Sequence, residues 1–186
     1  AVLNAKEADV SVLFKTAGFT KLEGAFLSTD IFPFDAILCL GNSLPHLTSR
    51  GLIMRALQDF HSCLGEGGML ILQNRNFNAV MARRERWIGP QSYRSEEGEW
   101  LFLRFYDFET DGMITFNIVR LHRESGSEWQ QNVSTVRLYP LLRDDLVDLL
   151  QTAGFVDIRL YGKLEEIEFD PTESENLVAV ARKPGD

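Results

Sequence analysis

The sequence predicts an α/β protein with a doubly wound sheet and an inserted antiparallel sheet. In the first and last parts of the chain, apolar runs such as "DAILCL" (35–40) and "MLILQ" (69–73) alternate with segments of helical period. In the middle part, long segments of alternating apolar and polar residues are separated by short turns. A continuous apolar run is typical of a parallel strand covered on both faces, whereas alternation is typical of antiparallel strands joined by hairpins.

The first part, residues 1–78, is expected to form a partial α/β core. Its helices are followed by glycines, at Gly18 and in "GEGG" (65–68), which can adopt the left-handed turn that ends a helix. The expected elements, in order, are a helix over 5–17, a strand over 22–27, a strand over 35–40, a helix over 49–64 and a strand over 69–73.

The middle part, residues 79–139, begins with an expected arginine-rich helix over 79–87. Three antiparallel strands are then predicted, in "EWLFLRFYDFE" (99–109), "MITFNIVRLHR" (113–123) and "EWQQNVSTVRLY" (128–139). One face of this sheet is expected to pack on the core through an aromatic series, namely Trp100, Phe102, Tyr106 and Phe108. We expect the inserted strands to cover the functional site.

The last part, residues 140–186, returns to a helical period over 141–153, which Gly154 ends. Two apolar segments follow, "FVDIRLYG" (155–162) and "NLVAVARK" (176–183). They predict two strands that complete the core.

The composition of the chain indicates which classes of partner it can bind. The net charge of -8 repels nucleic-acid phosphates, so we expect a small-molecule substrate and no nucleic acid. The apolar stretches fall well short of the roughly 20 residues that span a bilayer, so no membrane contact is expected. With no signal peptide at the start, the sequence predicts a soluble cytoplasmic protein. The two cysteines, Cys39 and Cys63, provide neither a disulfide framework nor the spacing of a metal site.

The candidate site lies where two core strands are expected to end. Gly41 and Asn42 follow the first strand, and Arg75 follows the second. Ligands of doubly wound sheets lie beyond the carboxyl ends of the strands. Ordinary structural roles are also open: Asn42 with Ser43 suits a turn or a helix N-cap, His46 suits a packed or solvent-facing histidine, and Arg75 suits a surface ion pair.

Several motifs follow one another along the chain in a characteristic order. "FDAILCLGNSLPHL" (34–47) is followed by "LGEGGMLILQNRNF" (64–77), and a helix that stops at "AGF" (153–155) precedes "VDIRLYG" (156–162) and a closing strand. This order resembles the class I S-adenosylmethionine-dependent methyltransferases, which have a Rossmann-like sheet. Within them it is most similar to the glycine and sarcosine N-methyltransferase group, which shares "LGNS" before "HL", the Gly-Gly turn, "RN" plus an aromatic residue, and inserted strands covering the site.

The resemblance implies S-adenosylmethionine as the cofactor. The implied cofactor-binding residues are Leu40, Gly41, Ser43 and His46. Asn42 would hydrogen-bond the substrate beside the methyl group, and Arg75 would bind a substrate carboxylate. Methyl transfer by direct displacement needs alignment and a water-poor pocket more than a strong acid or base, and a guanidinium group suits bidentate carboxylate binding.

The start of the chain departs from this pattern. No GxGxG loop follows a strand, and "AVLN" (1–4) looks like the end of a second strand, with Asn4 where the group has an acid. Ala25 stands where the group has an aspartate near the adenine. We therefore expect an N-terminally truncated core that begins after the first strand and helix. The open strand edges would then be filled by a homo-oligomer or by a chain that supplies the missing segment.

Three functions remain open. The first is a small-molecule methyltransferase whose acceptor is an amine bearing a carboxylate. The second is a methyltransferase-like domain without catalytic activity, which serves as a binding or assembly module. The third, a dinucleotide-dependent enzyme, is disfavoured because no phosphate-binding glycine loop follows a strand. The acceptor atom stays undecided, because members that methylate nitrogen, oxygen and carbon share this scaffold.

Overall fold

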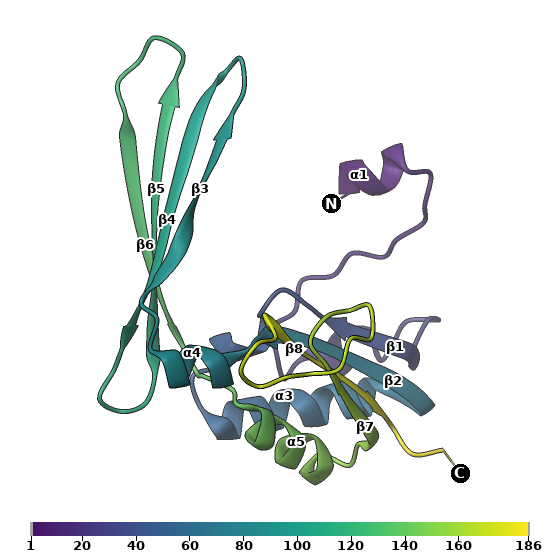
Figure 1. Ribbon diagram of the computed structural model, residues 1–186. Coiled ribbons are helices and arrows are strands. Elements are labelled where there is room, and N and C mark those ends of the chain that lie inside the picture. Colours follow the sequence, from purple (N-terminus) through teal and green to yellow (C-terminus); the bar gives the residue numbers. More distant parts are fainter. Residues whose placement is uncertain (1, 186) are drawn as a thin grey trace.

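The computed structural model describes residues 2–185, which form two four-stranded sheets (Figure 1). The core sheet consists of β1 (Phe34–Cys39), β2 (Leu64–Arg75), β7 (Val156–Tyr161) and β8 (Asn176–Arg182). The inserted sheet consists of β3 (Trp87–Arg94), β4 (Gly98–Phe108), β5 (Ile114–Glu124) and β6 (Gln130–Leu138). The helices are α1 (Val2–Glu7), α2 (Leu22–Phe26), α3 (Arg50–Cys63), α4 (Phe77–Arg83) and α5 (Arg143–Thr152), with a short 3-10 helix η1 (Leu44–His46).

The core sheet has the strand order β1-β2-β8-β7. β1 runs parallel to β2, with Cys39 opposite Leu72, and β8 runs antiparallel between β2 and β7. This mixed α/β arrangement agrees with the fold class that the sequence predicts. Within residues 2–185 only β2 pairs with β1, so the outer edge of β1 is open and Leu38 is 60% exposed.

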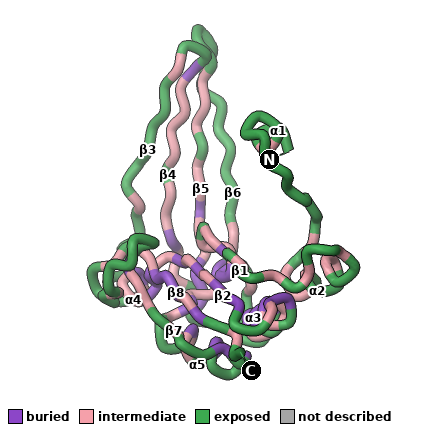
Figure 2. Tube along the Cα trace, turned by 90° about the vertical axis from the view of Figure 1, so that its right-hand side faces the viewer, coloured by how far each residue is buried: buried purple, intermediate pink, exposed green. Residues whose placement is uncertain are grey.

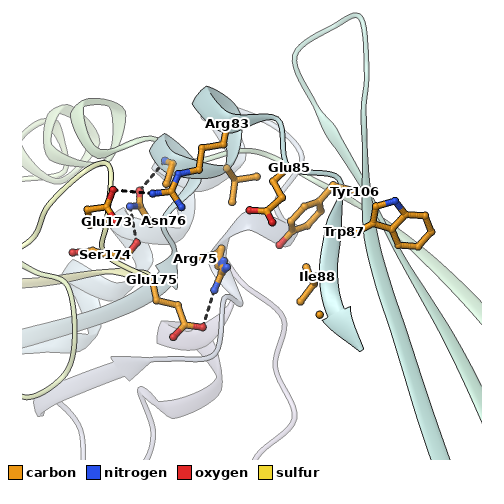
Figure 3. A pocket seen from close by; sticks show the side chains of 13 residues that line it. Arg75, Asn76, Arg83, Glu85, Trp87, Ile88, Tyr106, Glu173, Ser174 and Glu175 are labelled. Atoms are coloured by element: carbon orange, nitrogen blue, oxygen red, sulfur yellow. Dashed lines mark hydrogen bonds and ion pairs between the residues drawn. The ribbon is translucent and has the colours of Figure 1, made fainter. Parts of the chain in front are cut away.

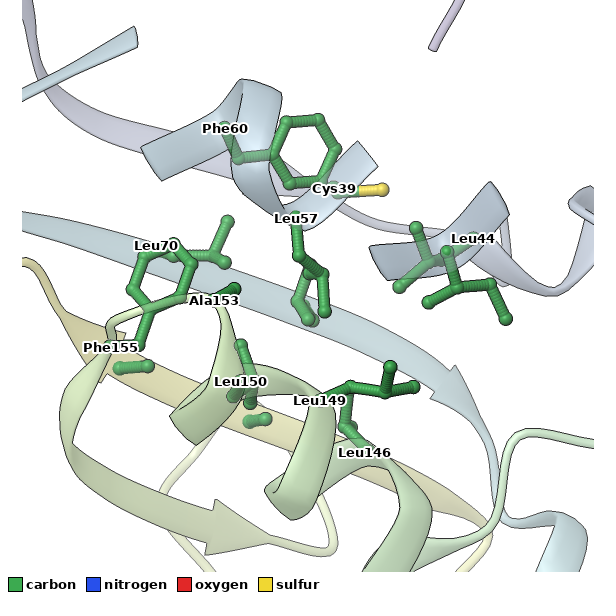
Figure 4. Packing of buried hydrophobic residues seen from close by; sticks show 14 of the residues in the cluster. Cys39, Leu44, Leu57, Phe60, Leu70, Leu146, Leu149, Leu150, Ala153 and Phe155 are labelled. Atoms are coloured by element: carbon green, nitrogen blue, oxygen red, sulfur yellow. The ribbon is translucent and has the colours of Figure 1, made fainter. Parts of the chain in front are cut away.

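Helices α3 and α5 pack on one face of the core sheet and form the main hydrophobic core (Figure 4). Apolar residues recur at helical spacing along α3, and the buried ones are Ile53, Ala56, Leu57, Phe60 and Cys63. The buried residues of α5 are Leu146, Leu149 and Leu150. Full burial of one large apolar side chain stabilises the fold by about 1.5–3 kcal/mol. None of the helices in residues 2–185 has the length and apolar content needed to cross a membrane.

The inserted sheet projects from the core, and only its base contacts it (Figures 1 and 2). The sequence predicts three strands, and this number is wrong because β3 is a fourth. The arginine-rich helix also ends earlier than expected: Arg84 adopts a left-handed conformation (φ 49°) after α4, and Trp87 already begins β3. Gly89 and Pro90 interrupt the alternation of β3, and this concealed the strand in the sequence.

Residues 5–17 do not form the single long helix that the sequence predicts. α1 ends at Glu7, and residues 10–17 lie outside any helix or strand. Asn4, expected at the end of a strand, lies in α1. Apolar side chains of this segment are exposed, with 54% of Val10 and 46% of Phe14 accessible. Helical spacing alone was therefore not enough to form a helix, because the apolar face has no surface to pack on within the described residues.

Residues 22–27 predict a strand but form the short helix α2. The carboxylate of Asp59, on α3, accepts hydrogen bonds from the backbone N–H groups of Leu22 (2.8 Å) and Glu23 (3.1 Å). The first N–H groups of a helix have no partner within the helix, so these bonds stabilise its start. A residue 36 positions away thus fixes this helix, which local sequence could not indicate.

Asn76 joins the start of α4 to the loop that precedes β8. Its Oδ1 atom accepts hydrogen bonds from the N–H groups of Asn78 (3.1 Å) and Ala79 (3.3 Å). Its Nδ2 atom donates to the carbonyl oxygens of Pro171 (3.1 Å) and Ser174 (2.8 Å). The side chain is 1% exposed, so water cannot replace these partners.

We expect Asn76→Ala to lower the free energy of unfolding by about 2–3 kcal/mol, because it removes a helix cap and leaves buried groups without partners. Urea denaturation measures this change. The control is Asn132→Ala, at an exposed residue whose side chain bonds only Arg120 within residues 2–185, with an expected loss below about 0.5 kcal/mol. Equal losses in both variants would contradict the role of Asn76.

His61, near the end of α3, packs edge-on against Phe155 with ring centroids 5.1 Å apart. Its Nε2 atom is buried and has no hydrogen-bond partner within residues 2–185. Burial, and then the charge of Lys183, lower the pKa of His61 from its ordinary value of 6.5. The unfolded chain therefore takes up this proton at a higher pH than the folded chain does.

The stabilising effect of neutral His61 is fully present above about pH 6.5 and is lost as the pH falls from there through the lowered pKa of the folded state. We therefore expect the free energy of unfolding to decrease between about pH 7 and pH 5.5, and to decrease less in His61→Gln. Urea denaturation across this range tests the expectation. The same pH dependence in both proteins would show that another group is responsible.

Candidate functional site

The chain turns sharply where β1 ends. Gly41 and Asn42 both adopt left-handed conformations, with φ values of 71° and 63°. The Asn42 N–H donates to the backbone oxygen of Gln73 (3.0 Å), and the Gly41 N–H donates to the side-chain oxygen of the same residue (3.2 Å). Glycine adopts such a φ without strain, and asparagine tolerates it better than most residues. The turn therefore lies against the end of β2.

The side chain of Asn42 links the ends of the two strands. Its Oδ1 atom accepts a hydrogen bond from the backbone N–H of Arg75 (2.9 Å). Because a backbone N–H can only donate, this contact assigns the orientation of the amide. The Nδ2 group makes no hydrogen bond within residues 2–185, and it keeps two hydrogens for a ligand. Asn42 can thus hold the turn and contact a ligand at the same time.

Arg75 forms an ion pair at the end of β2. Its Nη1 atom lies 2.9 Å from Oε1 of Glu175, and the two side chains are 35% and 68% exposed. Figure 3 shows Arg75 between Glu175 and Tyr106, directed into a pocket beside α4. An exposed pair of this kind contributes about 0–1 kcal/mol, so a ligand carboxylate can compete for the guanidinium group.

A cleft of about 330 Å³ separates the end of the core sheet from the base of the inserted sheet. Its wall on the core side includes Gly41, Asn42, Gln73, Arg75 and Glu175. Its wall on the inserted side includes Ile88, Gln91, Arg104, Tyr106 and Phe116. The pocket of Figure 3, about 270 Å³, adjoins it and shares Arg75, Ile88, Tyr106 and Glu175 with it.

Tyr106 lies at the border of both hollows and is 5% exposed. Burial raises the pKa of its hydroxyl, while the positive charges of Arg75 and Arg104 act in the opposite direction. The phenol is therefore neutral near pH 7, where it can donate or accept a hydrogen bond. The charges of Arg75 and Arg104 thus both act on this one hydroxyl, against the larger effect of burial.

Half of the residues predicted for the site line this cleft, namely Gly41, Asn42 and Arg75. The other half, Leu40, Ser43 and His46, lie outside its lining. The Ser43 hydroxyl donates to the carbonyl oxygen of Leu40 (2.8 Å) and so stabilises the turn, and His46 is exposed on η1. The structure thus brings the two residues predicted to contact substrate together with one predicted to contact cofactor.

Sequence reasoning did not single out three further cleft residues, namely Gln73, Arg104 and Glu175. For Gln73 and Glu175 the sequence gives no signal, because ordinary polar residues at strand ends have no distinctive spacing. For Arg104 the sequence does give a signal. It interrupts the aromatic series Phe102, Tyr106 and Phe108, and the alternation of a strand places Arg104 on the same face as these aromatic residues. A charged residue at such a position is a reason to look for a ligand.

The known proteins that this chain resembles in sequence are methyltransferases. The chain is 28% identical over 156 residues to a glycine/sarcosine N-methyltransferase of Aphanothece halophytica, a match that covers 81% of this chain and 52% of that protein. It is 29% identical over 168 residues to a glycine/sarcosine N-methyltransferase of Halorhodospira halochloris, covering 88% of this chain and 56% of that protein. The chain thus spans about half the length of these relatives. No family model matches the chain.

Solved structures show the same fold. An S-adenosylmethionine-dependent methyltransferase from Clostridium acetobutylicum superposes with a TM-score of 0.73 at 12% identity, over 99% of this chain and 70% of that one. DesVI of Streptomyces venezuelae gives a TM-score of 0.73 at 12% identity, over 98% of this chain and 69% of that one. The chain therefore has the S-adenosylmethionine-dependent methyltransferase fold and is related in sequence to the glycine and sarcosine N-methyltransferases.

Proposed function

We propose that this chain takes part in S-adenosylmethionine-dependent methylation of a small amine that bears a carboxylate. The observation that carries the proposal is the contact between Asn42 and Arg75 at the ends of β1 and β2, in a cleft that also contains Tyr106. The names of the relatives support it, because glycine and sarcosine are both small amines with a carboxylate.

The turn after β1 offers the cofactor an approach to the backbone. At Gly41 no atom lies within 4 Å of the position that a Cβ would occupy, so a ligand can come close to the chain there. The Asn42 amide and the Tyr106 hydroxyl add polar groups beside it. In this proposal the residues on the cofactor side are Leu40, Gly41, Ser43 and His46.

When bound, S-adenosylmethionine supplies a methyl group carried on a positively charged sulfur. Asn42 and Tyr106 would orient the acceptor nitrogen so that its lone pair faces this methyl group. Arg75 would hold the acceptor by its carboxylate. The wall formed by the inserted sheet would limit the access of water. No strong acid or base is needed for these tasks, and the cleft contains amide, phenol and guanidinium groups with one carboxylate, Glu175, which is paired with Arg75.

The open edge of β1 favours the alternative, a binding or assembly module without catalytic activity. Its outer edge has no partner strand within residues 2–185, and such an edge can pair with a strand of a second copy or of another chain. In the proposed enzyme the same pairing would complete the core sheet. The alternative differs only in that no methyl group is transferred.

Calorimetric titration with S-adenosylmethionine and S-adenosylhomocysteine tests the proposal. We expect binding of both, followed by transfer of a labelled methyl group to glycine or sarcosine. Binding without transfer to any amine would favour the assembly module. Failure to bind either compound, as an isolated chain and in complex with a partner that pairs with β1, would overturn the proposal.

We expect Arg75→Ala to raise the KM for sarcosine about 10- to 100-fold, because a charged hydrogen bond to the carboxylate is lost. The Kd of S-adenosylmethionine should change less than threefold. The control is Arg83→Ala, which removes a similar ion pair to Glu173 of the same loop (3.0 Å). Equal losses for sarcosine and cofactor in Arg75→Ala would count against a carboxylate-binding role.

A further inference from the structure

Arg104 differs from the other charged residues of the inserted sheet because its charge faces the cleft. It lies on β4 two positions before Tyr106, and alternation places both side chains on the same face of the strand. Both residues line the cleft together with Asn42 and Arg75. The strand thus brings a second guanidinium group to the site, from the wall opposite Arg75.

One nitrogen of the Arg104 guanidinium group has no partner within the described part of the chain. The Nε atom is buried and has no hydrogen-bond partner, and residues 2–185 provide no ion pair for Arg104. A buried donor without a partner destabilises a protein, and the cost is larger for a charged group. An anion in the cleft would remove this cost.

Arg75, in contrast, already has a partner, since its charge is offset by Glu175 at 2.9 Å. The cleft therefore contains two guanidinium groups and one carboxylate, which leaves one positive charge uncompensated. The whole chain carries a net charge of -8, so this excess is local. The position of Arg104 identifies where in the cleft an anion would be attracted.

We propose that Arg104 is a substrate-binding residue that determines specificity, and that it holds the acceptor's carboxylate opposite Arg75. The inference rests on the proposed function and names the residue on which selection of carboxylate-bearing amines depends. A guanidinium fork can donate two parallel hydrogen bonds to a carboxylate, and a rotation of the Arg104 side chain toward the cleft would bring its buried, unpaired Nε–H to the ligand as one of these donors.

This assignment also gives the acceptor a direction in the cleft. In glycine or sarcosine a single carbon separates the amine from the carboxylate. With the carboxylate between Arg104 and Arg75, the amine lies within reach of Asn42 at the end of β1. An amine without a carboxylate would leave the Nε–H of Arg104 unsatisfied, and the site would therefore discriminate against it.

The first test is carboxylate binding, which does not require methyl transfer. Sarcosine and acetate are titrated into the ¹⁵N-labelled protein, and the Nε–H resonance of Arg104, assigned by its loss in Arg104→Lys, is followed by NMR. We expect both ligands to shift this resonance, and dimethylamine, which is sarcosine without its carboxylate, to leave it in place. Arg104→Met should weaken the binding of sarcosine about 10- to 100-fold.

The matched control is Arg120→Met, at an exposed arginine of β5 on the same sheet. It should bind sarcosine as the unchanged protein does. Unaltered sarcosine binding in Arg104→Met, or no shift of the Nε–H resonance with either carboxylate, would overturn the inference.

The second test separates this inference from the proposed function. Where methyl transfer is observed, Arg104→Met should raise the KM for sarcosine and leave the Kd of S-adenosylmethionine within threefold. Arg104→Lys should restore part of the loss, because it keeps the charge without the fork. Carboxylate binding that depends on Arg104 in a protein without methyl transfer would support the inference while contradicting the proposed function.

Discussion

The site depends on one hydrogen bond, from the backbone N–H of Arg75 to Oδ1 of Asn42. It joins the two parallel strands beyond the last pair of their shared ladder, Cys39 and Leu72. The left-handed turn at Gly41 and Asn42 makes the contact possible, because it directs the Asn42 side chain toward β2. Together with the two hydrogen bonds from the turn to Gln73, it fixes the position of the Asn42 amide relative to the end of β2.

Charge distribution gives the cleft its chemical character. An acidic chain with a net charge of -8 repels anions over most of its surface. Arg75 and Arg104 both line the cleft, one from each sheet, and among the described residues that line it Glu175 is the one acidic residue. A small anion is thus attracted to the cleft although the chain as a whole is acidic.

The inserted sheet has two parts with different tasks. Its base packs on α4 and the core through a second hydrophobic cluster that contains Phe77, Tyr106, Ile114 and Leu138. This packing holds Tyr106, and with it the base of β4 that carries Arg104, against the end of the core sheet. Its distal part projects away from the core, with most of β6 exposed (Figure 2). The residues of the cleft therefore lie on the part of the sheet that is best fixed.

Sequence by itself determined the elements whose apolar pattern is strong and local: the parallel strands β1 and β2, the helices α3 and α5, the closing strands and three hairpin strands. It also indicated Asn42 and Arg75, because residues that follow parallel strands meet at one edge of a sheet. Tertiary structure decided the rest. α2 forms because Asp59 stabilises its first N–H groups. Arg104 joins the site because the base of the inserted sheet lies against the end of the core sheet, a contact between distant parts of the chain that the position of Arg104 on its strand does not by itself reveal.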